Sequence, residues 1–156
     1  GVGTTFTIYL PAGERQVIPQ PEEERGLLVG KGKILVMDDE EMVREVLGRM
    51  VARLGYEAEV ARDGGEAIEM FVQAHGFGQE FAAVILDLTV PGTMGGKETM
   101  AKLLEIDPQV KAIVSSGYSD DPIMADFQKY GFSGVIAKPY KISELGKILQ
   151  EVAMGK

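Results

Sequence analysis

The fold of this 156-residue chain is decided by residues 33–54, KILVMDDEEMVREVLGRMVARL. The first five of them, KILVM, form a short apolar run that is typical of a buried strand. The rest predict a helix, because the apolar residues recur three and four positions apart and so share one face. The residues of this stripe are Met42, Val43, Val46, Leu47, Met50, Val51 and Leu54. A buried strand that leads into an amphipathic helix is the repeating unit of an α/β protein.

The same unit repeats along the rest of the chain. Further strands are predicted at 56–60, 82–86, 110–114 and 134–137. The second helix buries Ala67, Ile68, Phe71 and Val72, the third Met100, Leu103 and Leu104, and the last Leu145, Ile148, Leu149 and Val152. A fourth helix is predicted over 121–130, with Asp121 as its N-cap and Pro122 at its first position.

The apolar content of the strands predicts their order in the sheet. The runs at 33–37, 82–86 and 110–114 are nearly all apolar, which favours central positions with helices on both faces. Residues 56–60 alternate between apolar and polar, which favours an edge. We therefore expect an α/β, doubly wound fold with a five-stranded parallel sheet in the order 2-1-3-4-5.

The first 32 residues differ in composition from the rest. Residues 4–10, TTFTIYL, resemble a single strand, and residues 15–32 are rich in proline, glycine and charge, as in a linker. A lone strand cannot bury its own face. We therefore expect residues 1–14 to be the end of a domain that lies elsewhere, 15–32 to be a linker, and 33–156 to be the α/β domain.

Composition excludes several classes of function. The formal charge is −8, which disfavours binding to nucleic-acid phosphates. The absence of cysteine excludes disulfides and thiolate sites, and the single histidine, His75, excludes a multi-histidine metal centre. No apolar run is long enough for a membrane span, and no signal peptide opens the chain. We expect a cytoplasmic domain with no membrane contact, whose chemistry depends on carboxylates, hydroxyls and lysines.

Polar side chains follow four of the five predicted strands. They are Asp38, Asp39 and Glu40 after the first, Asp87 after the third, Ser115 and Ser116 after the fourth, and Lys138 after the fifth. Parallel strands bring their carboxyl ends to one edge of the sheet. Three aspartates meeting there repel one another unless they take up protons or bind a cation, and Mg²⁺ prefers such oxygen ligands. The edge therefore predicts Mg²⁺-dependent phosphoryl chemistry, with one aspartate as a possible nucleophile.

Over residues 33–153 the sequence resembles the receiver domains of two-component response regulators. The resemblance rests on four segments in order and spacing: KILVMDDEEMVRE, AAVILDLTVPGTMGG, IVSSGYSD and IAKPY. It implies a flavodoxin-like receiver fold in which Asp87 accepts a phosphoryl group from a partner's phosphohistidine. It also implies that Asp38 and Asp39 bind Mg²⁺ with help from Asp87 and the backbone carbonyl of Thr89.

The same resemblance assigns roles to the last two polar positions. Ser116 corresponds to the hydroxyl that turns toward the phosphoryl group, and Lys138 to the lysine that pairs with it. The bond between Lys138 and Pro139 is expected to be cis. Many receivers carry a tyrosine or phenylalanine three residues before this lysine, where this chain has Val135. The ring whose rotation links phosphorylation to the face of the fourth strand, fourth helix and fifth strand is therefore missing, and the sequence does not predict signalling through that face.

Residues 1–14, GVGTTFTIYLPAGE, resemble the closing strand of a histidine-kinase ATP-binding domain. A kinase end, a linker and a receiver follow one another in hybrid histidine kinases, so we expect the chain to be the C-terminal part of one. The expected partner is the phosphohistidine of a kinase dimerisation domain or a phosphotransfer domain. ATP would bind only in the parent's kinase domain, whose motifs are absent here, so we expect no self-phosphorylation from ATP.

Two alternatives stay open alongside this interpretation. Val135 favours a docking module that folds as a receiver without phosphate turnover. An aspartyl-phosphate hydrolase would need a second acid at the position of Thr89, and is disfavoured. His75 lies near the end of a predicted helix and is not expected to donate a phosphoryl group. Tyr118 and Tyr140 are expected to be surface or hinge rings.

Overall fold

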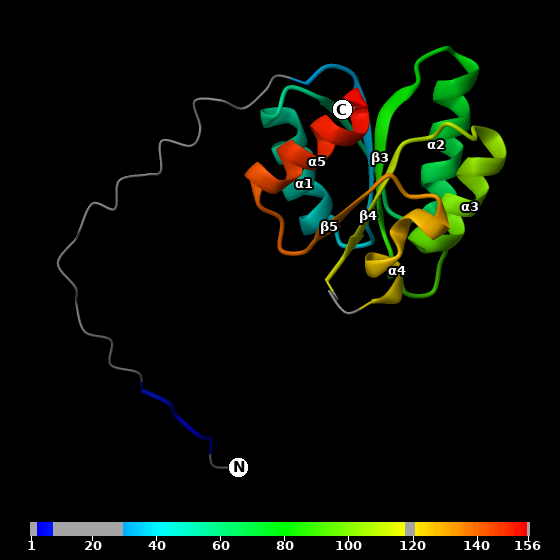
Figure 1. Cartoon of the computed structure of the whole chain (residues 1–156). Helices are drawn as coiled ribbons and strands as arrows, with labels where there is room; N and C mark the ends of the chain where they lie inside the picture. Colours follow the sequence, from blue (N-terminus) through cyan, green and yellow to red (C-terminus); the bar gives the residue numbers. More distant parts are fainter. Residues whose placement is uncertain (1–2, 8–29, 118–120, 156) are drawn as a thin grey trace.

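The structure is a computed structural model that describes residues 3–7, 30–117 and 121–155 (Figure 1). Strands and α-helices alternate along residues 33–154, with one short 3₁₀-helix after α4. The elements are β1 Lys33–Met37, α1 Glu41–Arg53, β2 Glu57–Ala61, α2 Gly64–Gly76, β3 Phe81–Asp87, α3 Gly96–Ile106, β4 Ala112–Ser116, α4 Pro122–Ala125, η2 Phe127–Tyr130, β5 Gly134–Ala137 and α5 Ile142–Met154.

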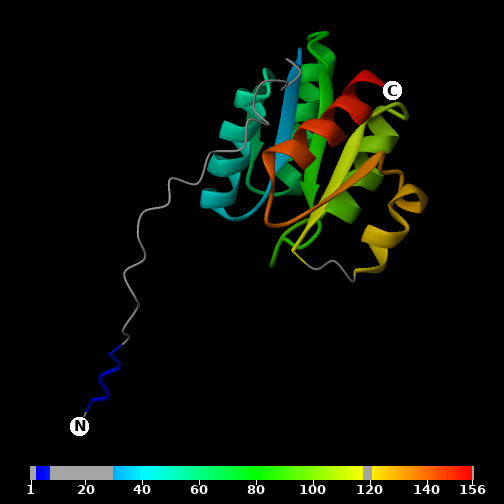
Figure 2. The ribbon, with the colours of Figure 1, turned by 60° about the vertical axis from the view of Figure 1, so that its left-hand side comes forward.

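The five strands form one parallel sheet in the order β2-β1-β3-β4-β5, which confirms the predicted topology. Helices α1 and α5 cover one face, and α2 and α3 cover the other (Figures 1 and 2). Among the described helices, the longest have 13 residues, and none has the length and apolar character that a membrane span requires.

Each strand contributes to both faces of the sheet, because successive side chains alternate in direction. In β3, Ile85 packs in the core beneath α1 and α5, whereas Leu86 packs in the core beneath α2 and α3. In β4, Ile113 and Val114 divide in the same way. This alternation places Asp87 and Ser115, which are neighbours across β3 and β4, on the side of α1 and α5.

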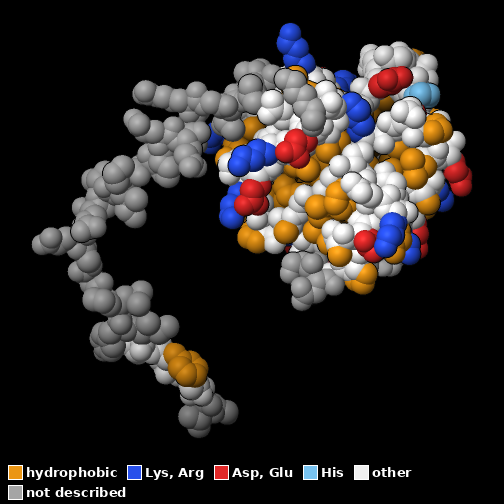
Figure 3. Space-filling model, viewed as in Figure 1, with side chains coloured by type: hydrophobic (Ala, Val, Ile, Leu, Met, Phe, Trp, Pro, Cys, Tyr) orange, Lys and Arg blue, Asp and Glu red, His pale blue; other side chains and the backbone are white. Residues whose placement is uncertain are grey.

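Fewer apolar residues of α1 and α2 are buried in the structure than the sequence pattern predicts. Leu47 and Val51 are fully buried, but Met42 is 79% exposed, Val46 49% and Val72 48%. The prediction was wrong for these three, because the sheet covers only the central part of a helix's apolar face. Apolar side chains also lie between charged ones on the described surface seen in Figure 3.

The helix predicted over 121–130 is divided into two pieces. Its start is as predicted: the Asp121 side chain accepts a hydrogen bond of 2.8 Å from the Ile123 N–H, and Pro122 is the first helical residue. The α-helix then ends after one turn, since Asp126 leaves helical geometry with φ −116° and ψ 32°. The 3₁₀-helix η2 follows and ends at Gly131, whose φ is +88°. The start of the helix was signalled in the sequence, and its early end was not.

Two further boundaries differ from the sequence prediction. Asp87, Ser115 and Ser116 lie within their strands as final residues and not after them. Residues 3–7, which cover part of the strand predicted at 4–10, form no strand, and residues 8–10 lie outside the described residues. The linker predicted at 15–32 also lies outside them up to residue 29, so the assignment of 1–14 and 15–32 stays a prediction.

Candidate functional site

The first carboxylates of the site follow β1 and are held by backbone contacts. Asp38 extends the pairing of β1 with β2, since its N–H donates to the Ala61 carbonyl at 3.1 Å. Its side chain is buried, and Oδ1 accepts a 3.0 Å hydrogen bond from the Glu40 N–H. Asp39, the next residue, is exposed. The turn therefore points one carboxylate into the protein and leaves the other at the surface.

Arg44 fixes this turn from the first turn of α1. Its Nη1 donates to the backbone carbonyls of Asp38 and Asp39 at 2.6 Å and 2.8 Å. Two charge-assisted hydrogen bonds from one guanidinium hold both peptide groups in one orientation. Arg44 was not among the predicted site residues. An arginine one helical turn into a helix that follows an acidic pair was the available signal.

Asp87 and Lys138 complete the cluster. Oxygens of Asp38, Asp39 and Asp87 lie within 4.8 Å of one another. The Lys138 Nζ contacts Asp38 Oδ2 at 2.6 Å and Asp87 Oδ1 at 3.2 Å. Asp38 and Asp87 are each less than 5% exposed, so these ion pairs are shielded from water. The Lys138–Pro139 bond is cis, as the resemblance implied.

Burial and charge together set the protonation of the site. Burial raises the pKa of Asp87 to about 6, against the usual 3.8, although the charge of Lys138 opposes the shift. Burial alone would lower the pKa of Lys138, but its hydrogen bond to Asp38 and the nearby acids outweigh burial and raise it. At neutral pH the lysine is charged, and the Asp87 carboxylate is available as a nucleophile or ligand.

The donor set fits a hard divalent cation. Three carboxylates from two neighbouring strand ends converge, and carboxylate oxygens are the ligands that Mg²⁺ takes from proteins. One positive charge from Lys138 balances only part of the negative charge of the three acids. The cluster therefore favours a further cation on electrostatic grounds.

The remaining predicted residues lie around this cluster. Ser116 ends β4 and is 2% exposed, next to the strand that carries Asp87. Thr89 lies two residues after Asp87 and is exposed, and the part played by its carbonyl stays a prediction. Tyr118 lies outside the described residues. His75 lies in α2, with its ring stacked on Phe71.

Tyr140 differs from its predicted role. Its ring packs against the core beneath α1 and α5, and its hydroxyl lies 2.7 Å from the Ser115 Oγ. It is thus a half-buried, hydrogen-bonded group and not a free surface ring, while the expectation of a hinge stays a prediction. The signal in the sequence was Ser115 itself, since a buried hydroxyl in an apolar strand requires a partner.

A doubly wound sheet with an acidic cluster and a lysine at the carboxyl edge defines the class of protein: an α/β domain with a charged site at its topological switch point. The family model of the response regulator receiver domain matches residues 34–150. The chain belongs to this family, and is thus a receiver domain of a two-component system.

Similar proteins include a chemotaxis protein and a sensor kinase. The chain is 29% identical over 122 residues to the chemotaxis protein CheY of Thermotoga maritima, covering 78% of this chain and 97% of that one. It is 29% identical over 161 residues to the sensor kinase CckA of Brucella abortus, covering 97% of this chain. The chain spans only 17% of the length of that kinase.

Solved receiver structures share the fold. A response regulator receiver domain from Clostridium thermocellum superposes with a TM-score of 0.72 at 22% identity, over 80% of this chain and 95% of that one. The response regulator TrrA of Thermotoga maritima, in complex with Mg²⁺-BeF, has a TM-score of 0.66 at 27% identity, over 78% and 98%.

Proposed function

We propose that the domain accepts a phosphoryl group from a partner's phosphohistidine onto Asp87 in a Mg²⁺-dependent reaction. The observation that carries this proposal is the contact of Lys138 with both Asp38 and Asp87, the two buried members of a cluster of three carboxylates. The Asp87 carboxylate would attack phosphorus as the phosphorus–nitrogen bond of phosphohistidine breaks. The imidazole would leave with the bonding electron pair, and the phosphoryl group would stay on Asp87 as an acyl phosphate.

The residues around Asp87 have separate parts in this step. Lys138 would pair with a phosphoryl oxygen, and Ser116 would donate a hydrogen bond to another. Asp38, Asp39, Asp87 and the Thr89 carbonyl would hold Mg²⁺, which neutralises charge on the phosphoryl oxygens when it is bound. Burial raises the pKa of Asp87 to about 6 in the metal-free cluster, and a cation bound to the same carboxylate would favour its charged, attacking form.

The test of the proposal is intact mass after incubation with acetyl phosphate and Mg²⁺. We expect the wild-type chain to gain one phosphoryl group and Asp87→Asn to gain none. Asp107→Asn serves as the matched control, because Asp107 caps the backbone at Gln109, away from the cluster, and should leave uptake unchanged. A purified phosphotransfer domain carrying phosphohistidine should give the same product. No added mass on the wild type would refute the proposal.

Val135 is the observation that favours the alternative of a docking module without phosphate turnover. It lies in β5 as a partly exposed residue that packs against the core beneath α2 and α3. The same mass experiment separates the two functions, since a docking module would gain no phosphoryl group. The complete set of Asp38, Asp39, Asp87 and Lys138 supports phosphoryl transfer over docking alone.

Binding of Mg²⁺ can be tested without a phosphoryl donor. A cation that binds the folded cluster raises the melting temperature, and at 100 times its Kd it contributes about 2.7 kcal/mol to stability. Asp39→Ala should remove this shift, because it deletes a ligand that is already exposed and so costs little stability by itself. A wild type whose melting temperature is unchanged in millimolar Mg²⁺ would contradict the proposed site.

We also propose that the chain is the C-terminal part of a hybrid histidine kinase, with the end of an ATP-binding domain at 1–14 and a linker at 15–32. The likeness to the sensor kinase CckA supports this, since it covers 97% of the chain and so extends beyond the receiver into the first 32 residues. Such a parent would draw on cytoplasmic ATP, which would place the receiver in the cytoplasm. Sequencing upstream of Gly1 should find a kinase core, and its absence would contradict the proposal.

A further inference from the structure

A pair of hydroxyls lies beside the charged cluster and has no part in the proposed phosphoryl transfer. Ser115 Oγ and the Tyr140 hydroxyl are 2.7 Å apart, and either can donate to the other. Ser115 is the register neighbour of Asp87 across β3 and β4, and Tyr140 follows Lys138 by two residues. The pair therefore joins the strand next to the predicted phosphoacceptor to the loop that carries the lysine.

The surroundings of the Tyr140 hydroxyl place it in the field of the cluster. Burial raises the pKa of Tyr140 to about 12, and the charges of Asp38, Asp87 and Lys138 act on the same hydroxyl. The ring packs against the core beneath α1 and α5, so its position is fixed by packing as well as by Ser115. A rigid ring with a bonded hydroxyl is suited to holding a loop in place.

The loop after β5 is tied to β4 at two points. The backbone N–H of Lys138 donates to the Ser116 carbonyl at 2.9 Å, and the Tyr140 hydroxyl bonds to Ser115. Between these points the Lys138 side chain reaches across to β1 and β3, where it meets Asp38 and Asp87. Loss of the hydrogen bond between Tyr140 and Ser115 would leave the backbone after Lys138 less constrained. The direction of the Lys138 ammonium group would then be less constrained as well.

We propose that Tyr140 and Ser115 are positioning residues that hold the Lys138 ammonium against Asp38 and Asp87. This inference rests on the proposed function for its kinetic consequence. A lysine already held at the acceptor meets the phosphoryl oxygens without reorganisation, which speeds transfer. Tyr140 acts through Lys138 and does not itself touch the reacting atoms. The pair lies apart from Val135 and depends on no ring rotation.

The kinetic test compares Tyr140→Phe, Ser115→Ala and the double variant in uptake of phosphoryl from acetyl phosphate. Tyr140→Phe keeps the ring and removes only the hydroxyl. We expect each single variant to slow uptake about three- to tenfold, with the double variant no slower than the slower single one, because both changes break the same contact. Mg²⁺ affinity should stay within about twofold, since the carboxylates are intact. Tyr130→Phe, whose ring lies under Lys97, is the matched control and should behave as wild type.

A second readout needs no phosphoryl donor. A lysine ammonium held by two carboxylates exchanges its protons slowly, so Lys138 should give a protected ¹⁵N-ammonium signal, assigned by its absence in Lys138→Met. We expect Tyr140→Phe to lose this protection, while the signal of Lys111, which donates to the Ala153 carbonyl at 2.9 Å, is unchanged. A structural hydrogen bond with no positioning role would lower the melting temperature of Tyr140→Phe and leave the Lys138 signal intact.

The outcomes distinguish this inference from the proposed function. If the wild type takes up no phosphoryl group, the proposed function fails, and the Lys138 signal in the wild type and in Tyr140→Phe still decides whether Tyr140 positions the lysine. If the wild type is phosphorylated on Asp87 and Tyr140→Phe matches its rate, only the inference is overturned. Additive losses in the double variant, or a parallel loss of Mg²⁺ affinity, would also overturn it.

Discussion

The carboxyl edge of the sheet and the segment between β4 and β5 differ in how their structure is determined. At the edge, the positions of Asp38, Asp87 and Lys138 follow from where β1, β3 and β5 end, and the side chains meet in a buried cluster. Between β4 and β5, a single predicted helix is broken into α4 and η2, and β5 itself carries Val135 where many receivers have an aromatic residue. The positions of the charged side chains thus follow from the sheet topology, whereas the course of the chain between β4 and β5 does not.

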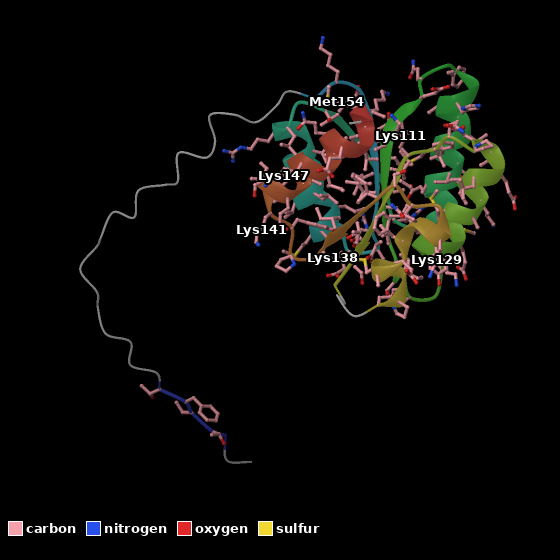
Figure 4. The ribbon with its side chains drawn as sticks, in the orientation of Figure 1. Lys111, Lys129, Lys138, Lys141, Lys147 and Met154 are labelled. Carbon is pink, nitrogen blue, oxygen red and sulfur yellow. The ribbon has the colours of Figure 1, made fainter. Side chains whose placement is uncertain are left out.

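The largest difference between the two regions should be seen in their ion pairs. Lys138→Met removes the cation from two buried carboxylates and should cost about 3–5 kcal/mol of stability. Lys129→Met breaks an exposed pair with Asp126 in the α4–η2 segment and should cost less than about 1 kcal/mol. Figure 4 labels both lysines. Chemical denaturation of the two variants measures the difference.

Phosphoryl uptake should separate the same two variants further. We expect Lys138→Met to lose more than about 100-fold in rate, the loss that follows removal of a charge-stabilising donor. Lys129→Met should keep the wild-type rate. Equal losses of stability and of uptake rate in both variants would contradict the comparison. They would mean that Lys138 contributes no more to either quantity than the exposed Lys129.

The sequence predicted the edge well, because the carboxyl ends of parallel strands must meet. Asp38, Asp39, Asp87 and Lys138 each follow or end an apolar run, and no side-chain detail was needed to bring them together. The hydrogen bond between Tyr140 and Ser115, by contrast, connects residues 25 positions apart and depends on the direction of one ring. The periodicity of apolar residues does not predict that direction. The end of α4 was missed because helix propensity allows a longer helix, and no glycine or proline between Pro122 and Tyr130 marks an earlier end.

The next prediction concerns the pH dependence of stability at the edge. The pKa of Asp87 is about 6 in the folded protein, against the ordinary value of 3.8 that applies to the unfolded chain. Folding therefore favours the protonated form of this carboxyl. Without metal, this carboxyl stabilises the protein fully below pH 3.8, and its contribution, up to about 3 kcal/mol, is lost as the pH rises through 6. Asp87→Asn should remove that slope, because the amide does not titrate.

Chemical denaturation of the wild type and of Asp87→Asn between pH 4 and about 7 measures whether the free energy of unfolding falls as the pH rises. The difference between the two proteins isolates Asp87 from the other carboxylates. A wild type that gains stability relative to Asp87→Asn as the pH rises would show that the lysine, and not burial, governs this carboxyl.

One glycine in each of the two regions lies close to neighbouring atoms, so that a methyl group there would disturb the structure. A Cβ on Gly96, at the start of α3, would lie 2.6 Å from the Asp87 carbonyl oxygen, so Gly96→Ala must displace the backbone of Asp87. A Cβ on Gly131 would meet the flexible side chain of Leu104 at 2.6 Å, and the φ of +88° adds strain. We expect each variant to lose about 1–3 kcal/mol of stability. Only Gly96→Ala should also slow phosphoryl uptake, as measured by intact mass over time.

The smallest effect is expected at Val135, where the chain departs from the usual receiver pattern. Val135 pairs with Val114 in the sheet and packs beneath α2 and α3, on the face opposite to Asp87 and Ser115. Val135→Tyr should therefore change phosphoryl uptake less than about twofold, since the new ring meets none of the charged groups and a partly exposed site accommodates it. A larger change in the uptake rate would mean that the carboxyl edge and the surface around Val135 are energetically coupled. It would show that the β5 surface acts on the acceptor site, and the Lys138 signal in Val135→Tyr would reveal whether it does so through the lysine.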